Sequence, residues 1–420
     1  MKFCIQDPSY KDSMYLQESL LTACEVGISG GGAYAFASKD GIELFLEDES
    51  FKKFMDSGTF FLIVGMDDIT NIRSLQELKN VRDKYKGHLT VKAYIHNSKG
   101  SIFHPKFSWF ETASGGILIV GSGNLTQQGL RHNREAYSVI DCDKKTFNDV
   151  ISEWNQWLSH SNPFLFDIDD LIVQRVAEQN TMKTIAVRRV KKDISKPHGK
   201  MDDNTFADLF KTQPKDNLNK KKKQNDKCNP NNLTSDNYGK MPLSELDDEI
   251  DSNTLYWKIS LKSEVLVAEI PRSGNRWKQA NFDKNTFENY FGATCGENGA
   301  YRILLKNVDK SGTLGKTEVR PSVSVSSQNY RFELDAAAGI DYPKDGKRPL
   351  GVFVKVSQRD FLYELVMPGD EGYDSLIVAM DEKEAASAKM RRLQFYCKEI
   401  SKKTPDLAIW RRIGDQEDDE

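Results

Sequence analysis

A histidine and a lysine two residues apart are the first side chains in this chain whose types and spacing suggest chemistry. His104 and Lys106 stand in the run Ile102–Trp109, whose pattern predicts a β-strand, so both side chains are expected on one face. A neutral imidazole is a competent nucleophile or general base near neutral pH, and an ammonium group can hold the non-bridging oxygens of a phosphate. This pair therefore suits attack on a phosphodiester.

Two further clusters follow at neighbouring strand ends. The apolar run Ile117–Val120 ends in Gly121-Ser122-Gly123, and these small residues let Asn124 approach a ligand closely. Asn133 and Glu135 again stand two apart, at the mouth of the next strand. An amide can stabilise charge on phosphate oxygens, and a carboxylate on the second ring nitrogen would fix the histidine tautomer. Three strand ends would thus place His, Lys, Asn and Glu around one point.

The elements that must position these residues alternate between strand and helix. The 420 residues are 38% apolar and 29% charged with a net charge of −3, which is typical of a globular protein of two or three domains. The alternation predicts an α/β fold with a mixed sheet flanked by helices. Helices are expected over Tyr15–Val26, Gly41–Met55, Ser74–Tyr85 and Thr146–Leu158. Strands are expected over 33–37, 60–65, 89–95, 102–109, 117–120 and 135–140.

The remaining chain divides by composition. Residues 1–184 are predicted to form the first domain, and 185–253 a charged, polar linker whose run Lys220–Lys223 could alternatively touch DNA. Residues 254–412 favour a compact, barrel-like, mainly β domain, and the acidic tail 413–420 is expected to be disordered. The expected elements are strands over 256–261, 265–269, 301–305, 322–326 and 351–356, and helices over 284–290 and 382–397.

Several function classes are disfavoured. No apolar run reaches the roughly 18 residues that a membrane span needs, and no apolar segment follows Met1 as in a secretory signal. The six cysteines are scattered without a C-x-x-C pair, which favours a reducing cytoplasm. No metal or other cofactor is expected. Asp67-Asp68 could hold magnesium, but a helix N-cap is favoured, and Gly30–Gly32 lacks the Lys-Ser/Thr of a phosphate-binding loop.

The ordered motifs resemble a known superfamily. His104-Pro105-Lys106-Phe107, then Gly121-Ser122-Gly123-Asn124-Leu125-Thr126, then Asn133-x-Glu135 resemble phospholipase D proteins, and within them the nucleases of the NgoFVII and BfiI restriction endonuclease type. The resemblance implies a covalent phosphohistidine at His104, phosphate binding by Lys106 and Asn124, assistance by Ser122, and orientation of the histidine by Glu135. Many relatives carry Asp five residues after the lysine. Glu111 stands there, and we assign it no catalytic role.

The number of motifs bears on assembly. The resemblance implies two facing His-Lys-Asn sets, one histidine taking the phosphoryl group and the other protonating the leaving oxygen. This chain has one set, and all six histidines precede residue 199. A homodimer through the N-terminal domain, with one active centre on its two-fold axis, is therefore expected. Two coupled imidazoles would give a bell-shaped pH profile. His132, near the motif, is interpreted as a surface residue.

The C-terminal block carries a basic loop. Arg272–Gln279 contains three cations, two amides and no acid, types that can read base edges and hold phosphates, although a solvated loop is the alternative. The segment from Trp257 to Phe282 resembles the C-terminal domain of NgoFVII-type enzymes, which is similar to the plant B-three DNA-binding pseudobarrel. The resemblance implies that this loop is one arm clamping the major groove. The candidate DNA-binding residues are Arg272, Ser273, Asn275, Arg276, Trp277, Lys278 and Gln279.

The function expected is a sequence-specific, metal-independent DNA endonuclease, a restriction enzyme of phage defence acting on double-stranded DNA in the cytoplasm. One alternative is a catalytically silent DNA-binding subunit of a restriction or defence complex. Another is a subunit that needs a separate helicase-like ATPase, because this chain has no Walker motif. A lipid-directed phospholipase would need two motifs per chain or a membrane-facing apolar patch, and the sequence shows neither.

Overall fold

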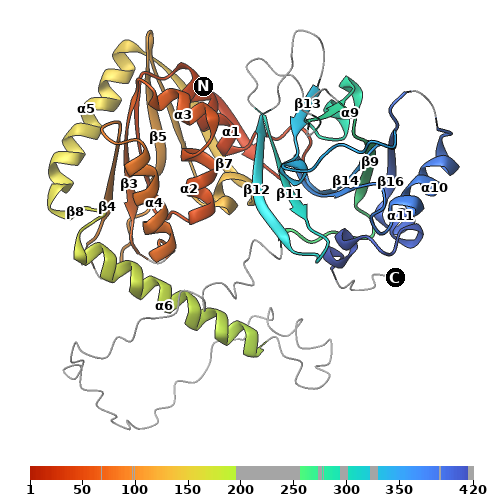
Figure 1. Cartoon of the computed structure of the whole chain (residues 1–420). Coiled ribbons are helices and arrows are strands. Elements are labelled where there is room, and N and C mark those ends of the chain that lie inside the picture. Colours follow the sequence, from red (N-terminus) through yellow and green to blue (C-terminus); the bar gives the residue numbers. More distant parts are fainter. Residues whose placement is uncertain are drawn as a thin grey trace, which may run out of the picture. The chain divides into compact units, whose positions relative to one another are not determined.

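A mixed sheet carries the chemistry-bearing segments. The computed structural model describes residues 1–194 and 256–414, except residues 68, 97, 99, 273–276, 278, 294–300, 322–329 and 387–388. For residues 186–194 it describes the backbone only. Its described N-terminal half contains an eight-stranded sheet of order β1-β7-β6-β5-β2-β3-β4-β8 (Figure 1). Strands β2, β3 and β4 run parallel, and β5, β6, β7 and β1 continue antiparallel, which confirms the predicted mixed α/β fold. The strands are β1 (Lys2–Gln6), β2 (Ser29–Tyr34), β3 (Thr59–Gly65), β4 (Leu89–Tyr94), β5 (Lys106–Thr112), β6 (Gly115–Gly121), β7 (Glu135–Asp143) and β8 (Leu165–Asp167).

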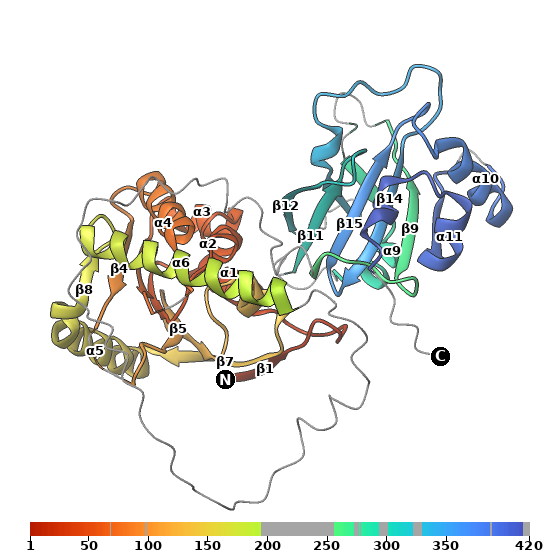
Figure 2. The same cartoon turned by 90° about the horizontal axis from the view of Figure 1, so that it is seen from below.

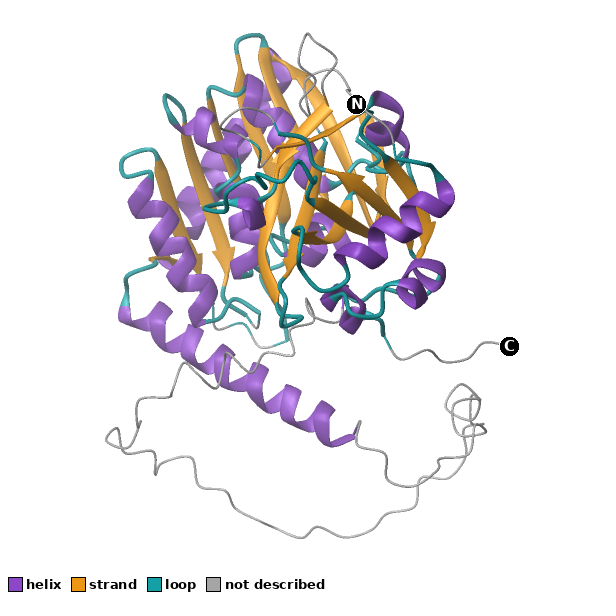
Figure 3. Cartoon of the chain, turned by 45° about the vertical axis from the view of Figure 1, so that its right-hand side comes forward, coloured by secondary structure: helices purple, strands orange, loops and turns teal. Residues whose placement is uncertain are grey.

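Helices cover both faces of this sheet because its strands are apolar on both sides. On β3, Phe60 and Leu62 belong to the core under α1–α4, whereas Phe61 and Ile63 belong to the core under α5. Figure 2 shows α5 on the opposite side of the sheet from α1–α4, and Figure 3 shows the strands between the two helical layers. The helices are α1 (Leu16–Val26), α2 (Lys39–Leu46), α3 (Glu49–Met55), α4 (Ile72–Lys84), the π-turn η1 (Gln128–His132), α5 (Lys144–Ser161), the 3₁₀ turn η2 (Asn162–Phe164) and α6 (Leu171–Ile194).

Two expectations about helix ends are wrong. The predicted helix Gly41–Met55 is two helices, because the Asp48 side chain accepts a bond from the Ser50 backbone N–H and so begins α3. The N-cap of α4 is Asn71, which accepts from the backbone N–H groups of residues 73 and 74. Asp67 instead accepts a bond from the Phe103 backbone N–H at 2.8 Å.

The predicted linker begins inside a helix. Helix α6 continues to Ile194, past the expected border at 184/185. Chain contacts group residues 1–181 with 252–420 in one unit, and 182–251 in another. The lysine run at 220–223 and the acidic residues 415–420 lie outside the described residues.

The described part of the C-terminal block is mainly β, as predicted. It holds a six-stranded sheet of order β12-β11-β15-β14-β9-β16 and the pair β10-β13. The strands are β9 (Glu264–Glu269), β10 (Gln279–Phe282), β11 (Arg302–Val308), β12 (Leu314–Pro321), β13 (Tyr330–Glu333), β14 (Leu350–Ser357), β15 (Asp360–Val366) and β16 (Arg392–Tyr396). The helices are α9 (Lys284–Asn289), the 3₁₀ turn η5 (Asp335–Ala337), α10 (Tyr373–Lys383), α11 (Cys397–Lys403) and the 3₁₀ turn η6 (Ala408–Arg412).

Two predicted C-terminal elements are wrong. The expected helix 382–397 is the end of α10 followed by β16, where Leu393 and Phe395 face the core with a period of two. The expected strand 256–261 forms only a single bridge, from Ile259 to Ile413. The expected strand 322–326 lies outside the described residues.

Buried ion pairs connect the N-terminal helices and turns to the C-terminal strands within the first unit. Asp360 at the start of β15 accepts from the Arg131 guanidinium of η1 at 2.7 Å. Glu18 of α1 lies 2.9 Å from Arg359, and both side chains are fully buried. Burial alone would raise the pKa of Asp360, but Arg131 and His132 beside it hold that pKa well below its usual range. A buried charge without its partner would cost several kcal/mol, so each of these buried ions needs the ion of opposite charge beside it.

Candidate active site

The three motif segments meet at one edge of the N-terminal sheet. Lys106 is the first residue of β5 and pairs with Tyr34 at the end of β2. Strand β6 ends at Gly121, which pairs with Tyr137 near the start of β7, and Glu135 opens that strand. Because β5 and β7 begin where β6 ends, Lys106, Ser122 and Glu135 belong to the same sheet edge.

His104 stands just outside the sheet rather than on a strand. Pro105 has no backbone N–H for a strand ladder, and β5 begins only at Lys106. The expected sharing of one strand face by His104 and Lys106 is therefore wrong. The segment is held on both sides instead, by the Phe103 N–H on Asp67 and by the Ala35 N–H on the Pro105 carbonyl at 2.8 Å.

The imidazole of His104 is exposed and has two defined neighbours. Its ring lies edge-on to Phe36, with centroids 6.1 Å apart. The Lys106 Nζ donates to the His104 carbonyl oxygen at 3.1 Å, so the ammonium group folds back toward the histidine. Partial burial lowers the pKa of Lys106, and the charge of Glu135 opposes that shift. The negative charge of Glu135 on β7 therefore acts on Lys106 across the intervening strand β6.

Glu135 is the acceptor of a small polar cluster. The Ser122 Oγ and the Asn133 Nδ2 donate to its two carboxylate oxygens, the latter at 3.0 Å. The backbone N–H of Ala136 in turn donates to the Ser122 Oγ at 3.1 Å. The serine is thus oriented by the same carboxylate that the sequence assigns to the histidine. The role of Glu135 toward His104 stays a prediction.

Asn124 is held by close backbone packing. A Cβ at Gly129 would lie 2.5 Å from the Asn124 backbone nitrogen, so only glycine fits there. The Leu125 N–H donates to the Phe36 carbonyl at 3.1 Å, which ties this turn to the segment after β2. Among the described residues, the buried Asn124 Oδ1 has no hydrogen-bond partner. This oxygen is a hydrogen-bond acceptor, so it is available to a donor group of a ligand.

His132 is not a surface residue, which corrects the sequence interpretation. Its ring stacks on Tyr256 with centroids 3.4 Å apart, and its Nε2 lies 3.5 Å from the Asp360 carboxylate. The ring is buried, and its part of the chain helps to position the site, because Gln6 holds the carbonyls of Gly129 and Asn133 on either side of it. The residues around His132 in the sequence give no sign of this burial, because the ring that covers it, Tyr256, is distant along the chain.

Burial makes His132 a pH-dependent element of stability. Burial lowers the pKa of His132 from 6.5, and Asp360 opposes that shift only in part. The unfolded chain then binds a proton at higher pH than the folded chain, so stability present above about pH 6.5 is lost as the pH falls. We expect the free energy of unfolding to drop between pH 7.5 and 5.5, and to drop less in His132→Phe. Urea unfolding at both pH values measures this, and equal drops in the two proteins would contradict it.

Glu111 lies away from the site edge, and among the described residues Asp67 contacts the site only through the Phe103 backbone N–H. Glu111 lies near the far end of β5, where it accepts a bond from the Ser29 hydroxyl at 2.7 Å. Asp67 lies 3.8 Å from the His96 Nε2, and Asp68 is outside the described residues. No group of three or more His, Cys, Asp or Glu side chains that could hold a metal occurs in the described part of the chain.

The basic loop of the C-terminal block is described only in part. Arg272 is exposed and Gln279 bonds to Glu333 at 3.3 Å, whereas Ser273, Asn275, Arg276 and Lys278 lie outside the described residues. Trp277 is buried, and its indole N–H donates to the Ile340 carbonyl at 2.8 Å. The prediction that Trp277 contacts DNA is therefore corrected, because Trp277 is a core residue. An amphipathic tryptophan in a basic loop fits either role equally, so sequence alone could not decide.

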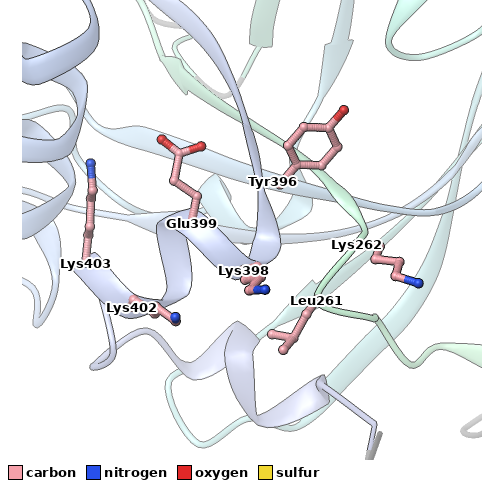
Figure 4. Close-up of a pocket in the computed structure, with 7 residues that line it drawn as sticks. All are labelled: Leu261, Lys262, Tyr396, Lys398, Glu399, Lys402 and Lys403. Atoms are coloured by element: carbon pink, nitrogen blue, oxygen red, sulfur yellow. The ribbon is translucent and has the colours of Figure 1, made fainter. Parts of the chain in front are cut away.

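A lysine patch in the C-terminal block was missed by the sequence reasoning. Figure 4 shows the side chains of Lys262, Lys398, Lys402 and Lys403 with Tyr396, Leu261 and Glu399 around a cavity of about 790 Å³. All four lysines are exposed, and Lys403 pairs with Glu382 at 2.6 Å. Tyr396 is 61% exposed. We call this surface the lysine patch. Lys398, Lys402 and Lys403 lie close together in the sequence, but Lys262 joins them only in the folded chain.

Comparisons with known proteins bear on the N-terminal half. Nuc from Salmonella typhimurium, a phospholipase D family member, is 15% identical over 40% of this chain and 95% of its own, with a TM-score of 0.29. NucT from Helicobacter pylori is 16% identical over 40% and 98%, with a TM-score of 0.28. Phosphatidylserine synthase from Haemophilus influenzae is 13% identical over 46% of each chain, with a TM-score of 0.29. No curated protein matches in sequence.

A family model matches the segment that holds the site. Residues 61–160 match the family described as cardiolipin synthase, PLD-like domain. This segment runs from β3 into α5 and contains all five residues assigned to catalysis, namely His104, Lys106, Ser122, Asn124 and Glu135. A search of the described helices for one long and apolar enough to cross a membrane finds none.

Proposed function

We propose that this chain, which contains a phospholipase D-like domain over residues 61–160, cleaves phosphodiester bonds of DNA without a metal. One observation supports this above all. The exposed His104 ring stands at a sheet edge beside the Lys106 ammonium group, and the Ser122–Glu135 pair and Asn124 come from the adjoining strand ends. A nucleophile and its phosphate ligands are thus assembled from three segments.

The chemistry proceeds in two displacements. A ring nitrogen of His104 attacks phosphorus, the P–O bond to the leaving strand breaks, and an acid protonates the departing oxygen. Water then attacks the phosphohistidine, the P–N bond breaks, and the ring is regenerated. The Lys106 ammonium and the Asn124 amide hold the non-bridging oxygens during both steps. Within the Asn124 amide it is the Nδ2 that would donate to a phosphate oxygen, whereas the buried Oδ1, which has no partner among the described residues, can only accept.

The acid comes from a second copy of the chain. His132 is buried and His88 bonds to the Gly58 carbonyl at 2.6 Å. His96 accepts a bond from the Ser98 N–H at 3.2 Å, and its Nε2 faces Asp67 at 3.8 Å, so we assign the acid to none of these three. We propose a homodimer through the N-terminal half, in which the partner's His104 protonates the leaving oxygen. Ile102 and Val120, which are 53% and 42% exposed beside this edge, support an apolar interface there.

The C-terminal block supplies DNA recognition in this proposal, as a B-three-like domain of a sequence-specific restriction endonuclease. Arg272 and the lysine patch are its described cations suited to DNA phosphates. There are two alternatives, a catalytically silent DNA-binding subunit and a subunit that works with a separate ATPase. A cleavage assay distinguishes them from the proposed enzyme.

Cleavage in the absence of metal tests the proposal. Mixed-sequence duplex DNA is incubated with the full chain in excess EDTA, and products are resolved on a denaturing gel. Discrete fragments, with a protein–DNA adduct trapped by rapid quenching at alkaline pH, are the expected result. Cleavage that needs Mg²⁺ would overturn the metal-free mechanism, and no cleavage under any condition would leave the silent-subunit alternative.

The lysine patch gives a quantitative prediction for DNA binding. Each lysine that neutralises a phosphate contributes about 0.9 to the slope of log affinity against log salt concentration. Lys398→Ala with Lys402→Ala should therefore weaken duplex binding and reduce the slope by roughly 1.8. Fluorescence anisotropy over a salt series measures this. The matched control replaces Lys53 and Lys86, two exposed lysines of the N-terminal half. Equal slopes in both double variants would exclude the patch as a DNA contact.

A further inference from the structure

An aromatic cavity of about 910 Å³ opens beside His104, on the sheet face that α5 covers. His104 itself belongs to the lining, so whatever fills the cavity is continuous with the reacting phosphate. We call it the aromatic cavity. Its volume lies within the roughly 300–1,000 Å³ typical of ligand sites. The aromatic side chains that dominate its wall are Tyr94, Phe103, Phe107, Trp154, Trp157 and Phe164.

The rings in this wall are arranged like a stacking platform. Tyr94 lies 4.2 Å from Phe103 with the ring planes 18° apart, and 6.2 Å from Trp157 with the planes 15° apart. Near-parallel rings present flat faces in one direction, which suits a planar partner. Trp157 is only half-buried and stands on the surface helix α5. Together with Phe164, which is 38% exposed, it is a ring that a ligand entering from solvent can meet.

Polar atoms in the same wall show that the occupant is not purely apolar. Among the described residues, the Trp109 Nε1 is buried without a hydrogen-bond partner. The His96 Nε2 also makes no hydrogen bond, and the Asp67 carboxylate lies 3.8 Å from it. Both Trp109 and His96 line the cavity. Trp109 is 9% exposed and the His96 side chain 10%. Leaving such groups unsatisfied is costly, so a ligand with hydrogen-bonding atoms at its edge is favoured.

Carboxylates complete the lining. Asp149 and Glu153, both exposed on α5, belong to the cavity wall and can accept bonds from amino groups. A free phosphate is disfavoured there by their charge. A planar ring system with acceptors and exocyclic amino groups along its edge satisfies the aromatic faces, the donor nitrogens and the carboxylates together. A nucleobase is such a group.

We propose that the aromatic cavity holds an unstacked base of the strand that His104 attacks, next to the scissile phosphate. This inference rests on the proposed function and adds a substrate class to it, namely DNA with an unpaired or extruded base at the cut. Taking a base out of a duplex costs free energy, and the cost is smallest where the base is already unpaired. Among duplex sites, one with an unpaired or mismatched base at the cut is then bound and cut in preference to a fully paired one.

Binding of abasic oligonucleotides tests this without relying on cleavage. A single abasic site is moved through a single-stranded oligonucleotide, and the affinity of the full chain is measured at each position. In the wild type, one position is expected to lose roughly tenfold in affinity, the order seen for one base–aromatic stack. In Trp157→Leu the intact oligonucleotide should bind roughly tenfold more weakly, and the abasic site should then have no further effect.

Two variants serve as controls. Trp157→Phe keeps a stacking ring and should retain the dependence on the abasic position. Tyr10→Leu removes an aromatic ring that is 56% exposed outside the cavity, and should leave affinity unchanged. A circular-dichroism melt of each protein shows that it is folded.

The outcomes separate this inference from the proposed function. Binding by the wild type with no position coupled to Trp157 would overturn the cavity as a base site and leave the nuclease proposal standing. A change in sedimentation from dimer to monomer in Trp157→Leu, without such coupling, would assign the cavity to the contact between copies and overturn the base site equally. Failure of the wild type to bind any DNA would overturn both.

Discussion

His104→Ala is expected to lose DNA cleavage by about 10⁴-fold or more, because it removes the nucleophile rather than a ligand. Of the other histidines, His132 is buried behind the site and His88 is bonded to a backbone carbonyl, so neither can substitute at the sheet edge. The trapped protein–DNA adduct should vanish together with turnover. Single-turnover cleavage in excess EDTA, with the adduct measured in parallel, gives both quantities.

The matched control for this variant is His160→Ala. His160 is exposed on α5 and belongs to none of the three motif segments, so its loss should leave the rate within about twofold. Retention of cleavage and of the adduct in His104→Ala would remove the histidine mechanism altogether. Loss of cleavage with the adduct retained would show that another residue is the nucleophile and that His104 acts later.

Arg131→Met is expected to destabilise the folded chain by about 3–5 kcal/mol, because it leaves the Asp360 carboxylate buried without its strongest partner. The Arg131 guanidinium is fully buried and donates to Asp360, to the Gln17 amide oxygen at 2.9 Å and to the Arg302 carbonyl at 3.1 Å. Asp360→Asn should cost a similar amount for the converse reason. Urea unfolding at pH 7 measures the two differences.

The double variant Arg131→Met, Asp360→Asn distinguishes a coupled pair from two separate losses. Its destabilisation should be smaller than the sum of the single values, since neither residual charge is stranded. Arg134→Met is the control, because Arg134 is 72% exposed and pairs with Asp7 at the surface, where such pairs contribute about 0–1 kcal/mol. Strict additivity of the two buried changes would show that the pair is not coupled.

The fold of the N-terminal half was largely readable from local patterns. The apolar runs 60–65 and 117–120, both of strand length, became β3 and β6. In β3 the run is continuous because both faces of the strand are covered, whereas Val120 at the end of β6 is 42% exposed. The expected helix at 382–397 failed because its sequence changes period partway. Leu393 and Phe395 are buried at a period of two in β16, whereas only Glu382 and Lys383 of the expected helix belong to α10. A pattern averaged over both segments hides that change.

In the candidate site, too, some features are visible in the sequence and others only in the structure. The types and order of His104, Lys106, Asn124 and Glu135 are carried by short segments, and a spacing of two or a run of small residues is visible without any structure. What these residues meet is not local. The Ser122 and Asn133 bonds to Glu135, and the unpartnered Asn124 amide, depend on how β5, β6 and β7 pair.

The sequence by itself determined which chemical groups stand in the three motif segments that the proposed function uses, because residue type and short-range spacing are properties of the chain alone. Only the tertiary structure decided that His132 and Trp277 are core residues, that Lys262 joins Lys398 in one patch, and that Tyr94 and Trp157 share a cavity with His104. These outcomes require distant segments to pack together, and packing is set by the strand order of the sheet rather than by any local pattern.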